Sequence, residues 1–153
     1  MIFGRQCGAS PSTVVKFAIR EKSRPGNDFD YIWCVFDCNG HGDLEEAFSL
    51  AQTNNIGVAF SNPNFELWYL LHFQDQTASL RGKSSITRLK KFIRDYRKSQ
   101  NVYPLLAPRQ SEAITRAGKL RKMHLRNDTT SPKHQNPSTT ADELVVFLNS
   151  LVR

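Results

Sequence analysis

The segment covering residues 56–73 most constrains the fold, because it holds a strand, a tight turn and a buried helix within eighteen residues. An apolar run with β-branched residues ends at Ser61, after which we expect Asn62 to cap a helix and Pro63 to fill its first position. Glu66 then falls in the first helical turn, where the helix dipole favours a negative charge. We predict that Glu66 lies beside the carboxyl end of the preceding strand, the edge where open α/β sheets bind ligands.

A similar strand, turn and helix precede this segment. Residues 31–36 are apolar on both faces of a strand, which is typical of a buried parallel strand covered by helices on each side, and the run stops at Asp37. After a turn, residues 43–46 have the spacing of a capping box and open a helix that extends to about residue 54. With a helix over residues 11–21 and a strand over 56–60, this order predicts an α/β fold with a right-handed parallel crossover.

The second half of the chain has helical patterns. We predict helices over residues 84–98 and 111–126, a surface loop over 127–138, and a last amphipathic helix that starts from a capping box at 140–143. In the first of these helices, Leu89, Ile93 and Tyr96 are expected on the apolar side and Lys98 on the basic remainder. A chain of 153 residues is long enough for one domain with a sizeable core. We therefore expect a single domain over residues 1–153, with an α/β core in 1–80 and a basic helical part in 81–153.

Charge is divided unevenly between these two parts. Residues 1–80 contain 5 Lys or Arg against 9 Asp or Glu, whereas residues 81–134 contain 15 against 3. This division is expected if the first part supplies an acidic centre and the second binds a polyanion such as nucleic acid. The alternative is a set of basic helices whose charges are only solvated.

Cysteine content and hydropathy bear on the compartment. The three cysteines, Cys7, Cys34 and Cys38, have no CxxC spacing and no neighbouring histidine cluster, so neither a disulfide framework nor a zinc site is indicated. No run of 18 apolar residues is present to span a bilayer, and residues 1–10 lack the apolar core of a signal peptide. We expect a cytoplasmic protein that makes no membrane contact.

Asp37 is the strongest candidate for a functional side chain, because an acid directly after an apolar strand lies at the carboxyl edge of the sheet, near the expected position of Glu66. Two carboxylates there suit Mg²⁺ or Mn²⁺, which bind carboxylates, waters and substrate phosphates. His41, in the turn after Asp37, is a candidate for contacting a phosphate or donating a proton. The alternatives are a turn-forming Asp37, a Glu66 that only stabilises its helix, and an exposed loop His41. His72 is expected to be a buried structural histidine.

Residues 31–37 and 61–73 together resemble the RloB-like family of bacterial proteins, and weaker resemblance extends through the basic helices to Thr140. The resemblance implies an association with restriction-modification and phage-defence loci, often beside an ATPase partner. It also implies a relationship to the Toprim fold of nucleases, primases and topoisomerases. We therefore expect a Toprim-like partial parallel sheet with flanking helices, and metal-dependent phosphodiester chemistry.

The sequence departs from the Toprim pattern at two of its acidic positions. Asp37 matches the first residue of the Asp-x-Asp motif, but Asn39 stands where the second acid is expected, and no early glutamate precedes the helix at residue 11. Compared with the family, the chain is expected to lack an amino-terminal strand and its acidic segment. Fewer acidic ligands weaken Mg²⁺ binding, so we expect a nuclease that is impaired or incomplete in this chain.

These observations lead to one reading of function, one rival, and a third possibility, which is an interaction protein with no nucleic-acid role. Asp37, Asn39 and Glu66 would hold the metal, with His41 as an accessory catalytic group, and the chain would act on DNA or RNA, including tRNA. Phosphates would be contacted by six side chains of the basic part: Arg88, Lys91, Arg94, Arg116, Lys119 and Lys122. The rival is a non-catalytic subunit that binds nucleic acid or docks onto an ATPase.

Overall fold

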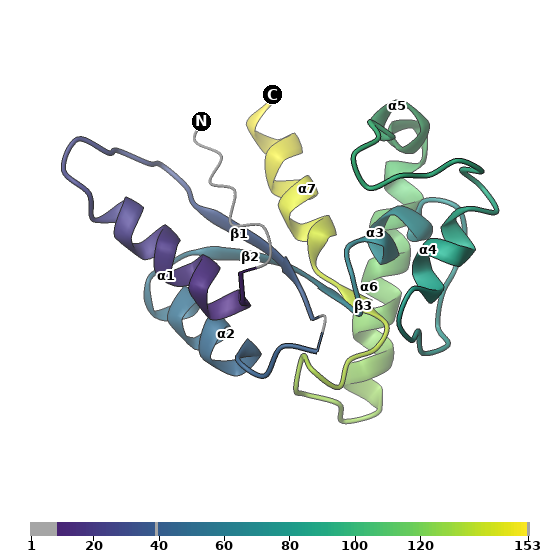
Figure 1. Ribbon diagram of the computed structural model, residues 1–153, viewed down its shortest axis with the longest axis horizontal. Coiled ribbons are helices and arrows are strands. Elements are labelled where there is room, and N and C mark those ends of the chain that lie inside the picture. Colours follow the sequence, from purple (N-terminus) through teal and green to yellow (C-terminus); the bar gives the residue numbers. More distant parts are fainter. Residues whose placement is uncertain (1–8, 39, 153) are drawn as a thin grey trace.

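The computed structural model describes residues 9–38 and 40–152. A three-stranded sheet runs through the centre in the order β1 (Trp33–Asp37), β2 (Gly57–Asn62) and β3 (Ser138–Thr139), as Figure 1 shows. β1 and β2 are parallel, with Trp33 opposite Gly57 and Asp37 opposite Ser61. The predicted α/β class and parallel crossover are therefore confirmed. The short β3 pairs antiparallel with β2, and it falls at the edge of the segment predicted to be a loop.

Two helices cover one face of the sheet. α1 (Pro11–Lys22) and α2 (Leu44–Thr53) lie together beside β1 and β2 in Figure 1, and both match the predicted helices closely. The predicted capping box at residues 43–46 is wrong in its hydrogen bonding: the Asp43 side chain accepts no bond from its own helix. Its Oδ2 instead accepts a 2.9 Å bond from the backbone N–H of Ser12 at the start of α1. Asp43 thus joins the two helices.

The turn after β2 differs in detail from the prediction. α3 (Glu66–Leu71) starts three residues after Pro63, so neither Asn62 nor Pro63 occupies the expected capping position. The Asn62 side-chain amide is used elsewhere, because it donates to the carbonyl oxygens of Pro132 and Lys133 at 3.0 and 3.1 Å. The prediction that Glu66 lies in the first turn is confirmed, since Glu66 is the first residue of α3.

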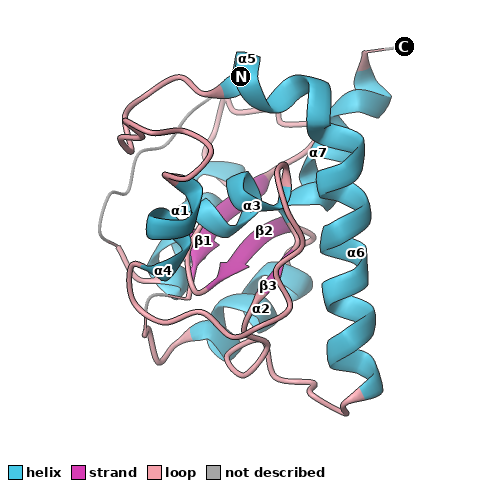
Figure 2. Ribbon diagram, turned by 90° about the vertical axis from the view of Figure 1, so that its right-hand side faces the viewer, coloured by secondary structure: helices cyan, strands magenta, loops and turns pink. Residues whose placement is uncertain are grey.

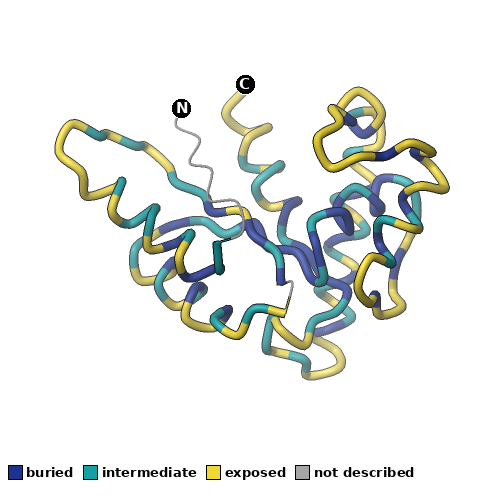
Figure 3. Tube along the Cα trace, in the orientation of Figure 1, coloured by how far each residue is buried: buried dark blue, intermediate teal, exposed yellow. Residues whose placement is uncertain are grey.

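The remaining helices form a second group against α3. These are α4 (Ser84–Leu89), α5 (Tyr103–Leu106), the 3₁₀ turn η1 (Ala107–Arg109), α6 (Gln110–Arg126) and α7 (Ala141–Leu151). Figure 2 shows α6, the longest of them, running along one side of the molecule. The predicted helix over residues 84–98 is wrong beyond Leu89, where the chain continues in turns. In Figure 3 the buried positions concentrate in the strands and α3, while the outer sides of α1 and α2 are exposed.

Side chains of β1 alternate between two environments. Cys34 and Phe36 point into the core made with α1 and α2, whereas Trp33 packs against Phe147 of α7 with ring centroids 5.5 Å apart. Val35 is 48% exposed, so the prediction that helices cover both faces of this strand is wrong on the α7 side. The Trp33 ring lies directly over Gly57, where a Cβ atom would come within 2.5 Å of the ring. Only glycine fits at that position of β2.

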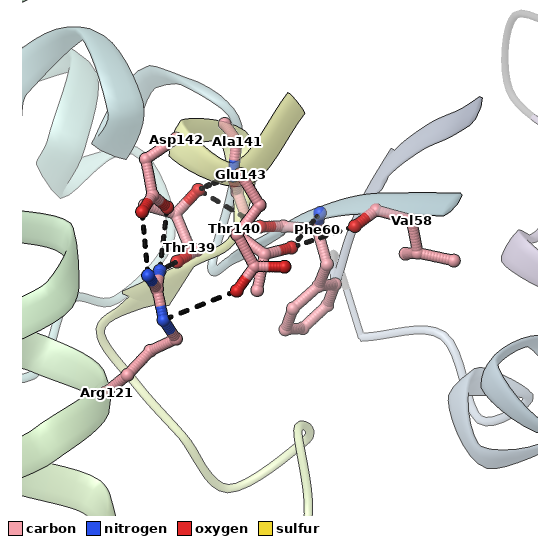
Figure 4. Close-up of polar contacts among 9 residues, drawn as sticks. Val58, Phe60, Arg121, Thr139, Thr140, Ala141, Asp142 and Glu143 are labelled. Carbon is pink, nitrogen blue, oxygen red and sulfur yellow. Dashed lines mark hydrogen bonds and ion pairs between the residues drawn. The ribbon is translucent and has the colours of Figure 1, made fainter. Parts of the chain in front are cut away.

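The carboxyl-terminal segment is fastened to the sheet and to α6 by buried polar contacts (Figure 4). Arg121 binds Asp142 with two bonds of 2.7 Å and donates to the Thr139 carbonyl oxygen at 2.7 Å. The Thr140 hydroxyl accepts a bond from the Phe60 N–H and donates to the Val58 carbonyl oxygen. The second predicted capping box is therefore wrong as well, because the Thr140 side chain bonds to β2 and not to α7. In the part of the chain that the structure describes, no helix is both long and apolar enough to cross a bilayer.

Candidate functional site

Asp37 ends β1 at the carboxyl edge of the parallel pair and is partly buried. Burial raises the pKa of Asp37 above its ordinary value, and the Glu66 carboxylate raises it further. Lys98, a hydrogen bond from the Phe65 backbone N–H and the charge of His41 oppose this rise in the pKa of Asp37. The carboxylate thus faces the beginning of α3. This backbone bond comes from Phe65, a residue distant in the chain, so it is not the local contact of a turn-forming aspartate, and Asp37 also lies within electrostatic range of a second acid.

Glu66 is the more deeply buried of the two acids, with an exposed fraction of 4%. Its Oε1 accepts a hydrogen bond from the Tyr96 hydroxyl at 3.3 Å and lies 3.6 Å from the Lys98 ammonium. Burial, followed by the charge of Glu66, raises the pKa of the Tyr96 hydroxyl, so Tyr96 remains a hydrogen-bond donor at neutral pH. Glu66 thus starts α3 with a hydroxyl donor and an ammonium group beside one of its carboxylate oxygens.

Of the four residues predicted for the metal and catalytic site, Asp37 interacts electrostatically with two others, Glu66 and His41. Asp37 ends β1, Glu66 starts α3, and His41 lies in the turn after β1. Asn39 lies outside the described residues. Within residues 9–38 and 40–152, no group of three or more His, Cys, Asp or Glu side chains is arranged to hold a metal ion.

The donor set bears on whether Mg²⁺ or Mn²⁺ fits. Mg²⁺ is often held by one or two carboxylates, with waters and substrate phosphates completing its six ligands, so Asp37 and Glu66 are sufficient in kind. Lys98 is a competing cation, because it interacts with both carboxylates. The Lys98 side chain is 71% exposed, so moving it into solvent costs little. The pair therefore fits a hydrated ion, provided that Lys98 moves away.

Lys98 and Tyr96 are members of the site that sequence reasoning missed. Both were assigned to a regular helix over residues 84–98, with Tyr96 on its apolar side and Lys98 on its basic side. The signal available was the tyrosine itself, since a tyrosine in an apolar stripe needs a hydrogen-bond partner for its hydroxyl. Nothing in the spacing identified Glu66 as that partner, thirty residues earlier.

The six predicted phosphate contacts occupy different surroundings. Lys91, Arg94, Lys119 and Lys122 are exposed and Arg88 is half-buried. Arg116 is turned inward, where it donates to the Leu71 carbonyl oxygen at 2.7 Å and lies 3.9 Å from Asp75. Lys119 and Lys122 are one turn apart on α6 and so share a face. Phosphate binding by these side chains stays a prediction, and Arg116 already has a structural role at the end of α3.

The family model described as RloB-like protein matches residues 2–148, nearly the whole chain. The chain belongs to the RloB-like family. No curated protein and no solved structure matches it. Family membership thus confirms the resemblance carried by residues 31–37 and 61–73, and in this RloB-like chain those two segments are β1 with Asp37 and the β2–α3 unit with Glu66.

Proposed function

We propose that this RloB-like chain acts on nucleic acid. Its basic helical part would bind the phosphate backbone, and the edge of the sheet that carries Asp37 and Glu66 would contact the nucleic-acid strand. The observation that carries the proposal is the convergence of these two acids, from the end of β1 and the start of α3. Acids at the carboxyl edge of a parallel sheet lie where such folds bind ligands. Residues 81–134 supply the basic part of the proposal, with 15 basic and 3 acidic side chains.

The basic part supports a polyanionic substrate. Neutralising phosphates with Lys and Arg releases counterions, which gives an affinity that falls steeply with salt. Lys91, Arg94, Lys119 and Lys122 are exposed and make no ion pair with any of the described residues, so their charges are available to phosphates. The association of the family with restriction-modification and phage-defence loci supports a role in defence, with DNA or RNA, including tRNA, as the substrate.

For the catalytic form of the proposal, Asp37 and Glu66, with Asn39, would hold Mg²⁺ or Mn²⁺. A bound ion of this kind activates water and stabilises charge on the scissile phosphate. The side chains contribute independently of it: Tyr96 and the α3 amino terminus orient Glu66, the Phe65 N–H orients Asp37, and His41 can accept or donate a proton beside Asp37. Lys98 interacts with both acids, and it would be free to contact a phosphate once a bound cation neutralised their charges.

A rival function is non-catalytic binding, in which this chain supplies a basic surface to a larger assembly with an ATPase. One observation favours it: Lys98 and Tyr96 already satisfy Glu66, and the described residues contain no three-ligand metal cluster. In that case the Asp37–Glu66–Lys98 group is a structural network that fixes the position of α3 relative to β1.

The two forms are separated by a cleavage assay on DNA and tRNA with Mg²⁺ or Mn²⁺, run beside a binding assay at low salt. The test variant is Asp37→Asn, and the matched control is Asp75→Asn, an exposed aspartate whose 3.9 Å contact with Arg116 is weak. Metal-dependent cutting that disappears in Asp37→Asn alone, with binding retained, supports the nuclease. Binding without metal-dependent cutting supports the rival, and a chain that binds neither nucleic acid at low salt overturns both.

A further inference from the structure

We propose that a pocket between α3, α5, α6 and α7 binds a nucleobase, an inference that rests on the proposed action on nucleic acid and deepens it. The pocket has a volume of about 190 Å³. Three aromatic side chains and three side-chain amides contribute to its lining: Trp68, Tyr69, Tyr103, Gln100, Asn101 and Gln110. Rings and amides in one pocket match a flat, polar-edged ligand, because bases stack on aromatic side chains and hydrogen-bond through their edges.

The size of the pocket sets a limit on the ligand. A protein cavity of about 150 Å³ holds a benzene molecule, so 190 Å³ accommodates a one-ring base and approaches the needs of a two-ring base in an open pocket. Among the described residues that line the pocket, none is a lysine, arginine, aspartate or glutamate. A phosphate or carboxylate group would find no counter-charge there, which leaves a neutral ring as the best match.

His72 supplies a directional contact at the wall of the pocket. Its side chain lies in the pocket lining although His72 as a whole is only 4% exposed, which confirms the predicted burial. The Nδ1 atom lies 2.9 Å from the Trp68 carbonyl oxygen, and because a carbonyl can only accept, Nδ1 carries the proton. Burial lowers the pKa of His72, so Nε2 is an unprotonated acceptor at neutral pH.

Within residues 9–38 and 40–152, the Nε2 atom of His72 makes no hydrogen bond and is not fully sealed from solvent. Because His72 lines the pocket, we assign this free acceptor to the pocket wall. An N–H group on a base edge would satisfy it, while the Gln and Asn amides offer both donors and acceptors for the rest of the edge.

The pocket adjoins the acidic site through shared side chains. Tyr69 lines the pocket and makes an edge-to-face contact with Tyr96, with centroids 6.1 Å apart, and Tyr96 in turn donates to Glu66. Gln100 lines the pocket two residues after Lys98, the lysine beside Glu66. A nucleotide with its base in the pocket would therefore lie close to the part of the molecule that holds Glu66.

The test uses the fluorescence of Trp68, which lines the pocket. In a Trp33→Phe background, Trp68 is the only tryptophan, and the chain is titrated with cytidine monophosphate and with a single-stranded oligonucleotide, intact or carrying abasic sites. The test variant is Tyr103→Ala and the matched control is Tyr31→Ala, because each tyrosine is 64% exposed and only Tyr103 lines the pocket. Loss of one stacked base is expected to weaken binding by about tenfold or more.

The expected result is quenching of Trp68 by the mononucleotide, weaker binding in Tyr103→Ala than in Tyr31→Ala, and weaker binding of the abasic strand. Because stacking is uncharged, the salt dependence of strand binding should be the same in both variants. A strand that binds with strong salt dependence but equally well when abasic, in both variants, overturns the pocket and leaves the proposed function standing. Absence of strand binding at low salt overturns the proposed function, while Tyr103-dependent binding of the mononucleotide alone would still support a nucleobase pocket.

Discussion

Replacing Arg121 with methionine should destabilise the fold strongly, because it leaves the Asp142 carboxylate buried without its partner. Arg121 makes two 2.7 Å bonds to Asp142, which is 3% exposed, and one to the Thr139 carbonyl oxygen. Removing one member of a buried ion pair costs about 3–5 kcal/mol. The Arg121 side chain is 31% exposed, so solvent screens the pair and we expect the lower end, about 3 kcal/mol.

The measurement is urea unfolding followed by circular dichroism, together with a thermal melt. For a chain of this size, about 3 kcal/mol corresponds to a fall in Tm of about 6–12 °C. The matched control is Arg126→Met, an exposed arginine on the same helix, which should change the free energy of unfolding by less than about 0.5 kcal/mol.

A double variant isolates the reason for the loss. In Arg121→Met with Asp142→Leu, no buried charge remains unpaired, so most of the stability should return, except for about 1 kcal/mol from the lost bond to Thr139. The reasoning is refuted if Arg121→Met costs less than about 1 kcal/mol, or if the double variant loses the sum of the two single losses.

Three further predictions concern binding, core packing and pH. Replacing exposed Lys119 and Lys122 with glutamine should each reduce the slope of log affinity against log salt by about 1, while an unchanged slope would remove them from the phosphate interface. Gly57→Ala should lower the free energy of unfolding in urea by about 1–3 kcal/mol, because the added Cβ would overlap the Trp33 ring. A decrease of less than about 0.5 kcal/mol, which is typical of a neutral substitution, would contradict this close approach. Burial raises the pKa of the Cys34 thiol from 9.0 to about 11, so the folded chain keeps a proton that the unfolded chain releases, and Cys34 lowers stability as the pH rises from about 9 to about 11. Urea midpoints across this range should fall more steeply for the wild type than for Cys34→Ala, and parallel curves would refute the assignment.

The sequence predicted the regular elements where periodicity and turn chemistry agree. α1, α2 and α6 are close to the predicted ranges, because each has an apolar stripe with helical spacing and clear breakers on both sides. β3 was not predictable in this way, since two residues hold no periodicity. Its pairing depends on tertiary contacts such as the 2.8 Å bond between the hydroxyls of Ser61 and Thr139.

The segment after α4 shows how a correct core assignment can accompany a wrong conformation. Leu89, Ile93 and Tyr96 are all buried, as the helical spacing predicted, but the helix ends at Leu89 and the later positions are reached by turns. The spacing of apolar residues indicates which side chains face inward, but it does not by itself determine the backbone conformation. The error matters for function, because the irregular path is what brings Tyr96 and Lys98 to Glu66.

Charge counts have the same limit as spacing. The excess of basic residues in 81–134 predicted a polyanion-binding part, but a count does not separate surface charges from those used internally. Arg116 and Arg121 direct their guanidinium groups to the carbonyl oxygens of Leu71 and Thr139, and so hold the end of α3 and the β3 strand in place. Their loss should affect stability before it affects binding.

α3 links the acidic edge to the proposed base pocket through its helical repeat. Glu66, Tyr69 and His72 follow one another at intervals of three residues, so each lies beside the next along the helix surface. Glu66 faces the acidic site, Tyr69 contacts both Tyr96 and the pocket, and His72 lines the pocket. A rotation or shift of this short helix would therefore move all three together, and a base bound in the proposed pocket would be expected to restrain the position of Glu66 relative to Asp37.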